Sequence, residues 1–186
     1  MFGVTEIITR RLRLRRPKPT DLEAMHAVLS DPAAMRYWST PPHTDVDQTR
    51  DWLGRMLNAS PEESDDFLIE CEGRIIGKAG CWRLPEIGFI LHPDYWGRGL
   101  ASEALAPIID HVFETRGLAA IEADVDPRNA GSLAVLKKLG FRETGRANRT
   151  WKVGDEWCDS VYLALPRPIL EWPLRRTASP NPGPES

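Results

Sequence analysis

The sequence is poor in cysteine, in long apolar stretches and in net charge, and each shortage excludes a class of protein. Its three cysteines form no CxxC pair, which argues against a disulfide framework and a zinc site. No uncharged stretch exceeds eight residues, whereas a membrane-spanning helix needs about 20 apolar residues. A net charge of -3 gives no general attraction to nucleic acid or anionic lipid. We therefore expect a cytoplasmic protein with no nucleic-acid or membrane partner.

The length and the hydrophobic content of the chain suffice for one compact domain. The chain has 186 residues, 41% of them hydrophobic, which suits a single core. We assign residues 1–172 to this domain. Residues 173–186 are rich in proline and nearly devoid of apolar side chains, so we expect a disordered tail there. The four histidines stand alone in separate segments, and we predict no metal site.

The first part of the chain predicts one strand and two helices. Polar and apolar residues alternate over 11–15, which predicts a strand with its arginines on the solvent face. Thr20-Asp21-Leu22-Glu23 is a capping box, so we expect a helix that starts there and runs to about Leu29. Apolar residues at helical spacing predict a second helix that ends at Asn58.

The rest of the chain alternates strands with helices. Alternation and turn residues predict strands over 67–71, 74–82, 86–91, 119–125 and 160–165, and another from Phe141 onward. Helical spacing predicts a long helix from near Arg98 and a shorter one over 129–139. Pro107 removes a backbone hydrogen bond inside the long helix, so we expect a kink or a shorter helix. The order β-α-α-β-β-β-α-β-α-β-β predicts an α/β fold, a mixed and mostly antiparallel sheet with two parallel strands.

A glycine-rich turn joins the strand over 86–91 to the long helix. It includes Tyr95-Trp96-Gly97-Arg98-Gly99-Leu100-Ala101. Glycine lets the backbone approach a ligand, and the first N–H groups of a helix are unpaired at the positive end of its dipole. The turn therefore predicts a seat for a pyrophosphate, with Arg98 adding a positive charge. For two glycines alone, a tight strand-to-helix turn is the more common explanation.

Residues 92–105 resemble motif A of the GCN5-related N-acetyltransferase (GNAT) family, in which Gln/Arg-x-x-Gly-x-Gly/Ala binds the pyrophosphate of acetyl-coenzyme A (acetyl-CoA). This sequence has Trp96-x-x-Gly99-x-Ala101, with Trp96 in place of Gln or Arg. Residues 11–22 and 129–141 are similar to the first strand and helix and to motif B of the ribosomal-protein alanine N-acetyltransferases. Because the three matches occur in order over most of the chain, the sequence is identified as a member of this family.

The resemblance implies a fold and a cofactor site. The parallel strands over 86–91 and 119–125 would splay apart at the centre of the sheet, with helices on both its faces. The pantetheine arm of acetyl-CoA would lie in the gap. A backbone N–H within 89–91 would also stabilise the thioester oxyanion. The expected cofactor-binding residues are Phe89, Ile90, Leu91, Trp96, Gly97, Arg98, Gly99, Leu100, Ala101, Ser102 and Asn129.

Acetyl transfer to an amine requires a neutral nucleophile, so a base or a water relay must remove a proton. Glu86, which opens a strand beside the gap, is the first candidate, and Asp124 on the partner strand is the reserve. An exposed strand end and a turn cap are the alternative explanations. Ser132 matches the serine proposed in the resembled branch to protonate the thiolate, although it is also placed to cap a helix. Many relatives use a tyrosine, which would fall at Leu136 here.

Several further side chains are candidates for the acceptor pocket. In relatives this pocket is walled by the segments that carry Trp38, Trp151 and Trp157, and Asp155, Glu156 and Asp159 are placed to attract a cationic amine. Aromatic core packing is the rival explanation for the tryptophans. Cys71 and Cys81 raise the possibility of an acyl-cysteine, but neither has a clear base or cation nearby in the sequence, so we expect core positions.

The expected function is transfer of an acetyl group from acetyl-CoA to a primary amine by direct attack in a ternary complex. The amine belongs to a protein N-terminus or a small molecule, and a homodimer is a further expectation. An inactive acyl-CoA sensor or partner-binding protein is the alternative. A remote one is a dinucleotide-binding oxidoreductase, because Gly97-x-Gly99-x-x-Ser102 is followed by Glu122 about twenty residues on.

Overall fold

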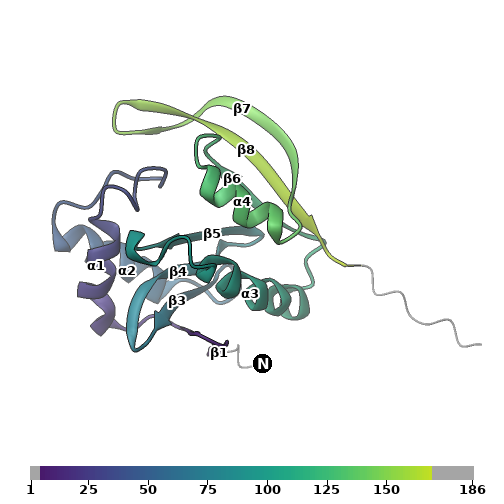
Figure 1. The fold of residues 1–186 in the computed structure, drawn as a ribbon. Coiled ribbons are helices and arrows are strands. Elements are labelled where there is room, and N and C mark those ends of the chain that lie inside the picture. Colours follow the sequence, from purple (N-terminus) through teal and green to yellow (C-terminus); the bar gives the residue numbers. More distant parts are fainter. Residues whose placement is uncertain (1–4, 169–186) are drawn as a thin grey trace, which may run out of the picture.

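The computed structural model describes residues 5–168 and places them around one eight-stranded mixed sheet (Figure 1). The strand order is β1-β2-β3-β4-β5-β6-β8-β7, and only β5 and β6 pair in parallel among the described strands. The strands are β1 (Glu6–Ile8), β2 (Leu12–Arg15), β3 (Asp65–Cys71), β4 (Arg74–Arg83), β5 (Glu86–Leu91), β6 (Ala120–Val125), β7 (Arg142–Val153) and β8 (Glu156–Pro166). The mixed α/β sheet is confirmed, while the expected tail at 173–186 lies outside the described residues.

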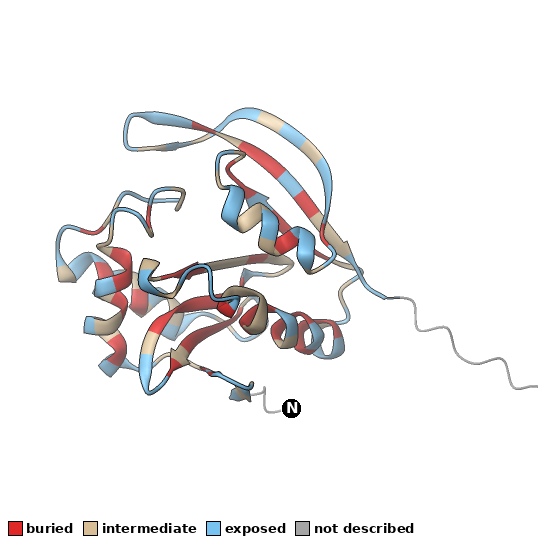
Figure 2. Cartoon of the chain, in the orientation of Figure 1, coloured by how far each residue is buried: buried red, intermediate tan, exposed pale blue. Residues whose placement is uncertain are grey.

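Helices cover both faces of the sheet, as expected. They are α1 (Leu22–Leu29), α2 (Val46–Asn58), α3 (Leu100–Arg116) and α4 (Ala130–Lys138). On one face, Leu105 and Ile108 of α3 are buried with Phe67 of β3. On the other, Met25 of α1 packs with Ile90 of β5. The buried stripes of α1 and α3 therefore hold β5 between two apolar layers (Figure 2).

The first hairpin differs from the expectation. β1 was not predicted. It pairs antiparallel with β2 through a turn where Thr9 N–H donates to the Leu12 carbonyl at 2.9 Å. The expectation that all arginines of β2 face solvent is wrong for Arg15, which is only 9% exposed. Its guanidinium makes two hydrogen bonds to Asp21, at 2.7 and 2.9 Å, and one to Glu70 at 2.9 Å. Two carboxylates compensate the buried charge.

The start of α1 also differs. Thr20 is not the N-cap, because it lies in a 3-10 turn, Pro19–Asp21, and the helix begins at Leu22. The Asp21 carboxylate instead accepts a hydrogen bond from Lys18 N–H at 2.7 Å, in addition to those from Arg15. The chain reversal before α1 is thus stabilised by an aspartate rather than by the predicted capping box.

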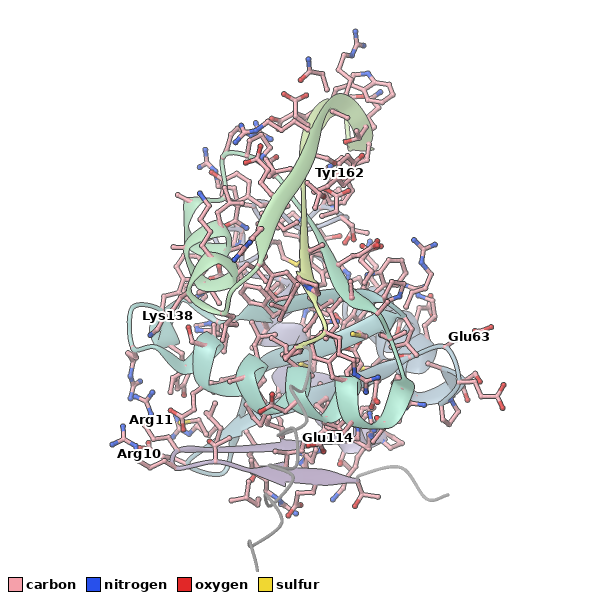
Figure 3. All side chains as sticks on the ribbon, turned by 90° about the vertical axis from the view of Figure 1, so that its right-hand side faces the viewer. Arg10, Arg11, Glu63, Glu114, Lys138 and Tyr162 are labelled. Carbon is pink, nitrogen blue, oxygen red and sulfur yellow. The ribbon has the colours of Figure 1, made fainter. Side chains whose placement is uncertain are left out.

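The second half follows the predicted order with different lengths. α3 runs through Pro107 to Arg116, so the helix is not shortened. β7 and β8 are longer than expected and form a hairpin that arches above α4 (Figure 1). Tyr162 lies on this arch (Figure 3). Register shifts between Glu143 and Gly145 and between Ala147 and Trp151 interrupt the pairing.

Candidate active site

β5 and β6 pair at one position, which joins the first residue of β5 to the third residue of β6. Glu86 pairs with Glu122, and Glu122 N–H donates to the Pro85 carbonyl at 3.0 Å. Beyond this point, β5 pairs only with β4, and β6 only with β8. The two strands therefore splay, which leaves the inner edge of β5 without a ladder partner and open to an added extended chain.

Two adjoining cavities lie around this gap. The α3 cavity, of about 870 Å³, includes residues at the starts of α3 and α4 in its wall. The α2 cavity, of about 630 Å³, is lined by residues of α2, β4, β5, β6 and the β7–β8 arch. Both walls contain Tyr37, Trp38, Phe89, Asn129 and Ser132. Ligands in the two cavities would therefore meet beside these five residues.

Ten of the eleven predicted cofactor residues line the α3 cavity. They are Phe89, Ile90, Leu91, Trp96, Gly97, Gly99, Leu100, Ala101, Ser102 and Asn129. Arg98 is the exception: its guanidinium lies 5.5 Å from the centre of the Tyr95 ring, and its carbonyl accepts a hydrogen bond from Arg11. The structure thus gathers three separate chain segments around one cavity and leaves the Arg98 side chain outside its wall.

The glycine turn has the left-handed backbone that glycine permits. Gly97 has φ 70° and Gly99, the N-cap of α3, has φ 74°. A Cβ would contact nothing within 4 Å at Gly97, and at Gly99 the nearest atom is 3.8 Å away. Conformation rather than lack of space therefore requires glycine here. The N–H groups of Leu100, Ala101 and Ser102 begin α3 without intrahelical acceptors, which suits an anionic ligand.

Trp96 ties this turn to the end of β5. Its Nε1 donates a hydrogen bond to the Leu91 carbonyl at 2.8 Å, while half of the residue is exposed. The tryptophan that replaces Gln or Arg of motif A thus makes a structural contact with the strand. This hydrogen bond uses one of the two acceptor positions of the Leu91 carbonyl.

At the start of α4, the residue that caps the helix is distinct from the residue proposed to donate a proton. Asn129 Oδ1 accepts a hydrogen bond from Ser132 N–H at 3.1 Å, so Asn129 caps the helix. The Ser132 hydroxyl makes no hydrogen bond within the described residues and lies in the wall shared by both cavities. Leu136, one turn further on, is buried. Ser132 is therefore free to donate a proton without disturbing the cap.

Two carboxylates line the α2 cavity on the splayed strands. Glu86 accepts hydrogen bonds from Trp82 Nε1 at 3.1 Å and Arg83 Nη2 at 3.3 Å. Asp124 forms no ion pair within the described residues. Removal of water by the surrounding protein raises the pKa of Asp124; a hydrogen bond from Ser160 opposes this rise, and the charge of Glu86 adds to it. A carboxylate with this bias is suited to accept a proton.

Comparison with known proteins identifies the fold and its chemistry. The model of the acetyltransferase (GNAT) domain family matches residues 11–142. The chain belongs to the GNAT acetyltransferase family. It is 33% identical over 148 residues to an uncharacterised N-acetyltransferase, p20, of Bacillus licheniformis, covering 75% of this chain and 83% of that protein. A GNAT-family acetyltransferase structure from Bacillus anthracis matches with a TM-score of 0.76 and 27% identity, covering 87% of this chain and 98% of that one.

Two relatives carry names that specify an acceptor. The [ribosomal protein uS5]-alanine N-acetyltransferase of Escherichia coli is 31% identical over 130 residues, 63% of this chain and 67% of that protein. The spermidine N(1)-acetyltransferase of Escherichia coli is 25% identical over 163 residues, 83% of this chain and 85% of that protein. The predicted family, enzyme class and co-substrate, acetyl-CoA, are confirmed by the family match. The alternative prediction of a dinucleotide-binding oxidoreductase is wrong, because the chain matches the GNAT family and its described strands include a single parallel pair.

The two cavities are also lined by residues that were not predicted from the sequence. Tyr37 lines both cavities, and its hydroxyl accepts a hydrogen bond from Arg36 Nε at 3.1 Å. Arg36 also lines the α3 cavity. Lys78 and Asp66 line the α2 cavity as a buried ion pair. The run Arg36-Tyr37-Trp38 after the first helix was the available signal, but its distance in sequence from β5 concealed its place in the site.

The predicted acceptor residues are only partly in this cavity. Trp38 and Trp151 line the α2 cavity, joined by Trp52 and Trp82, which the sequence analysis did not select. Trp157 is absent from both cavity walls and 47% exposed. Asp155, Glu156 and Asp159 are also absent from both walls. Glu156 instead forms an ion pair with Arg128, which lines the α3 cavity, so the predicted acceptor role of these acidic residues gains no support from the cavity walls.

The acetyltransferase has no thiol suited to a covalent route among its described residues. All three cysteines are buried, as expected for Cys71 and Cys81. Burial, with the charges of Asp66 and Asp65, raises the pKa of Cys81 to about 12. A thiol with this pKa stays protonated at neutral pH and is a poor nucleophile.

Within residues 5–168, no three His, Cys, Asp or Glu side chains are placed to hold a metal ion. In the same part of the chain, no helix is both long and apolar enough to cross a membrane.

Proposed function

We propose that this acetyltransferase transfers the acetyl group of acetyl-CoA to a primary amine by direct attack in a ternary complex. The observation that carries the proposal is the wall of Phe89, Asn129 and Ser132 shared by the α3 and α2 cavities. An amine in the α2 cavity and a thioester in the α3 cavity would meet there. The buried, protonated Cys81 argues against an acyl-enzyme step.

The α3 cavity fits the co-substrate by the chemistry of its wall. The unpaired N–H groups at the start of α3 are suited to the pyrophosphate, and the unpaired edge of β5 to the amides of the pantetheine arm. A backbone N–H in Phe89–Leu91, on the strand that borders the gap, would stabilise negative charge on the thioester oxygen. Asn129 keeps its amide N–H groups for the same arm while its oxygen caps α4. Bound acetyl-CoA supplies the activated acetyl group.

The residues of this chain then move two protons. Asp124 is better placed than Glu86 to take one from the amine, because Glu86 is already hydrogen-bonded to Trp82 and Arg83. The raised pKa of Asp124 increases its affinity for a proton. Ser132 Oγ, free of hydrogen bonds within the described residues, gives the other proton to the departing thiolate.

Calorimetric titration with acetyl-CoA, CoA and NADH, followed by thiol release in the presence of amines, tests this function. Gly99→Glu is the informative variant, because it places a negative side chain at the N-terminus of α3. Gly117→Glu is its matched control: Gly117 ends the same helix with φ 63° and has open space around its Cβ position. Both variants carry the same backbone strain and charge.

We expect saturable binding of acetyl-CoA and CoA to the wild type and to Gly117→Glu, none to Gly99→Glu, and no binding of NADH. Unchanged acetyl-CoA affinity in Gly99→Glu would exclude the glycine turn as the pyrophosphate site. Binding without thiol release for any amine would favour the inactive acyl-CoA sensor over the enzyme.

A further inference from the structure

The α2 cavity is rich in aromatic rings, but three of these rings are already beside cations of the protein. Lys78 Nζ lies 5.7 Å from the centre of the Trp38 ring. Arg83 Cζ lies 4.8 Å from that of Trp82, and Tyr37 has the guanidinium of Arg128 at 5.8 Å. A ring that already has one cation at its face is a poor site for another, because the two charges repel. These rings do not form a cage for ammonium groups.

Three of the four carboxylates in the cavity wall also have a cation of the protein as partner. Asp66 is 2.8 and 3.0 Å from Lys78 Nζ, and both side chains are buried. Glu86 is 3.3 Å from Arg83, and Asp126 is 2.6 Å from Arg128. Asp124 alone in this wall forms no ion pair within the described residues. The cavity therefore offers one carboxylate that no cation of the described residues neutralises, which matches one ammonium group.

The remaining wall favours an uncharged, flat body. Trp52, Trp151, Tyr162 and Phe89 line the cavity, and no cation lies over their rings in the described part of the chain. Trp151 Nε1 is buried without a hydrogen-bond acceptor among these residues. A polyamine offers this wall no ring, only a flexible chain with additional charges. Aromatic rings pack favourably against one another.

We infer that the acceptor is a primary amine on an aromatic body with no second positive charge, and that Trp52 on α2 and Arg83 on β4 select it. The inference rests on the proposed function and names its substrate class. Trp52 provides ring contact, whereas Arg83 occupies Glu86 and the Trp82 ring and so repels a second ammonium. A free arylalkylamine and a peptide with an aromatic first residue share this chemistry.

The test measures kcat/KM by thiol release with 2-phenylethylamine, spermidine and a short peptide that begins with phenylalanine. We expect 2-phenylethylamine to exceed spermidine by about 100-fold, the size of discrimination that a substrate-binding pocket can supply. A higher value for the peptide than for the free amine would support the aromatic-amine class and identify a protein N-terminus as its source. A higher value for spermidine would overturn the inference.

Two variants separate the selecting residues from the general fold. Trp52→Ala should lower kcat/KM for 2-phenylethylamine about 10-fold without lowering it for spermidine. Trp157→Ala is the matched control, because Trp157 is exposed and lines neither cavity. Arg83→Gln should raise kcat/KM for spermidine and so reduce the preference for 2-phenylethylamine over spermidine. Equal loss with both amines in Trp52→Ala, or an unchanged preference in Arg83→Gln, would contradict the assigned roles.

Acetyl-CoA titration in each variant keeps the two proposals distinguishable. Normal binding with spermidine as the best acceptor would overturn the substrate class and leave the acetyltransferase function standing. Absence of acetyl-CoA binding to the wild type would instead overturn the proposed function and with it the substrate class. Normal binding with no turnover of these three amines, but with thiol release for another amine, would overturn the substrate class alone.

Discussion

Arg11 and Glu103, 92 positions apart in the sequence, join the first hairpin to the helix that follows the glycine turn. Arg11 Nε donates to Glu103 Oε2 at 2.6 Å, and Arg11 N–H donates to Oε1 at 2.8 Å. Thr9 adds a hydrogen bond to Oε1 at 2.7 Å. The same arginine donates from Nη1 to the Arg98 carbonyl at 3.0 Å. One side chain thus holds both the turn and the first turn of α3, and Figure 3 shows Arg11 at the edge of the molecule.

Arg11→Met should therefore raise the KM for acetyl-CoA about 3- to 10-fold with little change in kcat. The loss of one or two hydrogen bonds to the turn corresponds to about 1 kcal/mol. Steady-state kinetics with varied acetyl-CoA measures the effect. Arg13→Met is the control, because Arg13 is on the same hairpin and bonds Glu6 instead of the turn. Equal effects of both substitutions would show that the hairpin matters only for general stability.

The part of the site that depends on neighbouring residues in the sequence, the glycine turn and the start of α3, could be predicted. Gly97 and Gly99 have a left-handed backbone, which a pair of glycines in a turn predicts. The periodicity of α3 predicts that its first N–H groups lie beside them. The splay of β5 and β6 followed from the family resemblance, because no periodicity reports how far two parallel strands stay paired.

The sequence could not predict contacts made between distant segments. Arg15 belongs to an alternating pattern that places it in solvent, yet Asp21 and Glu70 cover it. Tyr37 enters the site because the segment after α1 lies beside β5, a position that no local pattern encodes. Trp157 was selected for its neighbourhood in sequence, but the turn of the arch carries it away from the cavity.

Ser132→Ala should lower kcat about 100-fold, the usual contribution of a general acid, and change the affinity for CoA by less than about twofold. The Ser132 N–H that Asn129 caps is retained in this variant, so thermal stability should not fall. Asn129→Ala is the comparison: it should lose about 1 kcal/mol of stability with its cap. Rapid-mixing kinetics, calorimetry and thermal unfolding separate the cases. A loss confined to CoA affinity in Ser132→Ala would assign the hydroxyl to binding.

Asp65→Asn should lower the free energy of unfolding by about 3–5 kcal/mol, because it removes the charge from a buried network. Asp65 is fully buried and accepts hydrogen bonds from Arg16 at 2.6 Å and Arg116 at 2.9 Å. Burial alone would raise the pKa of Asp65, but these hydrogen bonds hold it below its usual range.

A lowered carboxyl pKa stabilises the folded state above the unfolded-state value of about 3.9, and this contribution disappears as the pH falls through the native pKa. Urea unfolding between neutral and acidic pH should therefore show a steeper loss of stability for the wild type than for Asp65→Asn. Asp110→Asn, on the exposed face of α3, serves as the control. Parallel pH curves for Asp65→Asn and the wild type would contradict the lowered pKa.

Asp124→Asn should affect stability in the direction opposite to Asp65→Asn, because the ionised form of Asp124 is unfavourable in the folded state. The raised pKa of Asp124 means that its ionised form destabilises the fold. This penalty is absent below the unfolded-state pKa of about 3.9, grows as the pH rises from there, and is fully present above the higher native pKa. At neutral pH the asparagine should leave the thermal midpoint unchanged or higher.

The same substitution removes the proposed base, so kcat at neutral pH should fall about 100-fold or more. Glu86→Gln is the matched variant, because both carboxylates line the α2 cavity on the splayed strands. A larger loss of kcat in Glu86→Gln than in Asp124→Asn would move the proton-accepting role to Glu86. Full activity in both variants would transfer it to a water relay, since the amine must still lose a proton before it attacks.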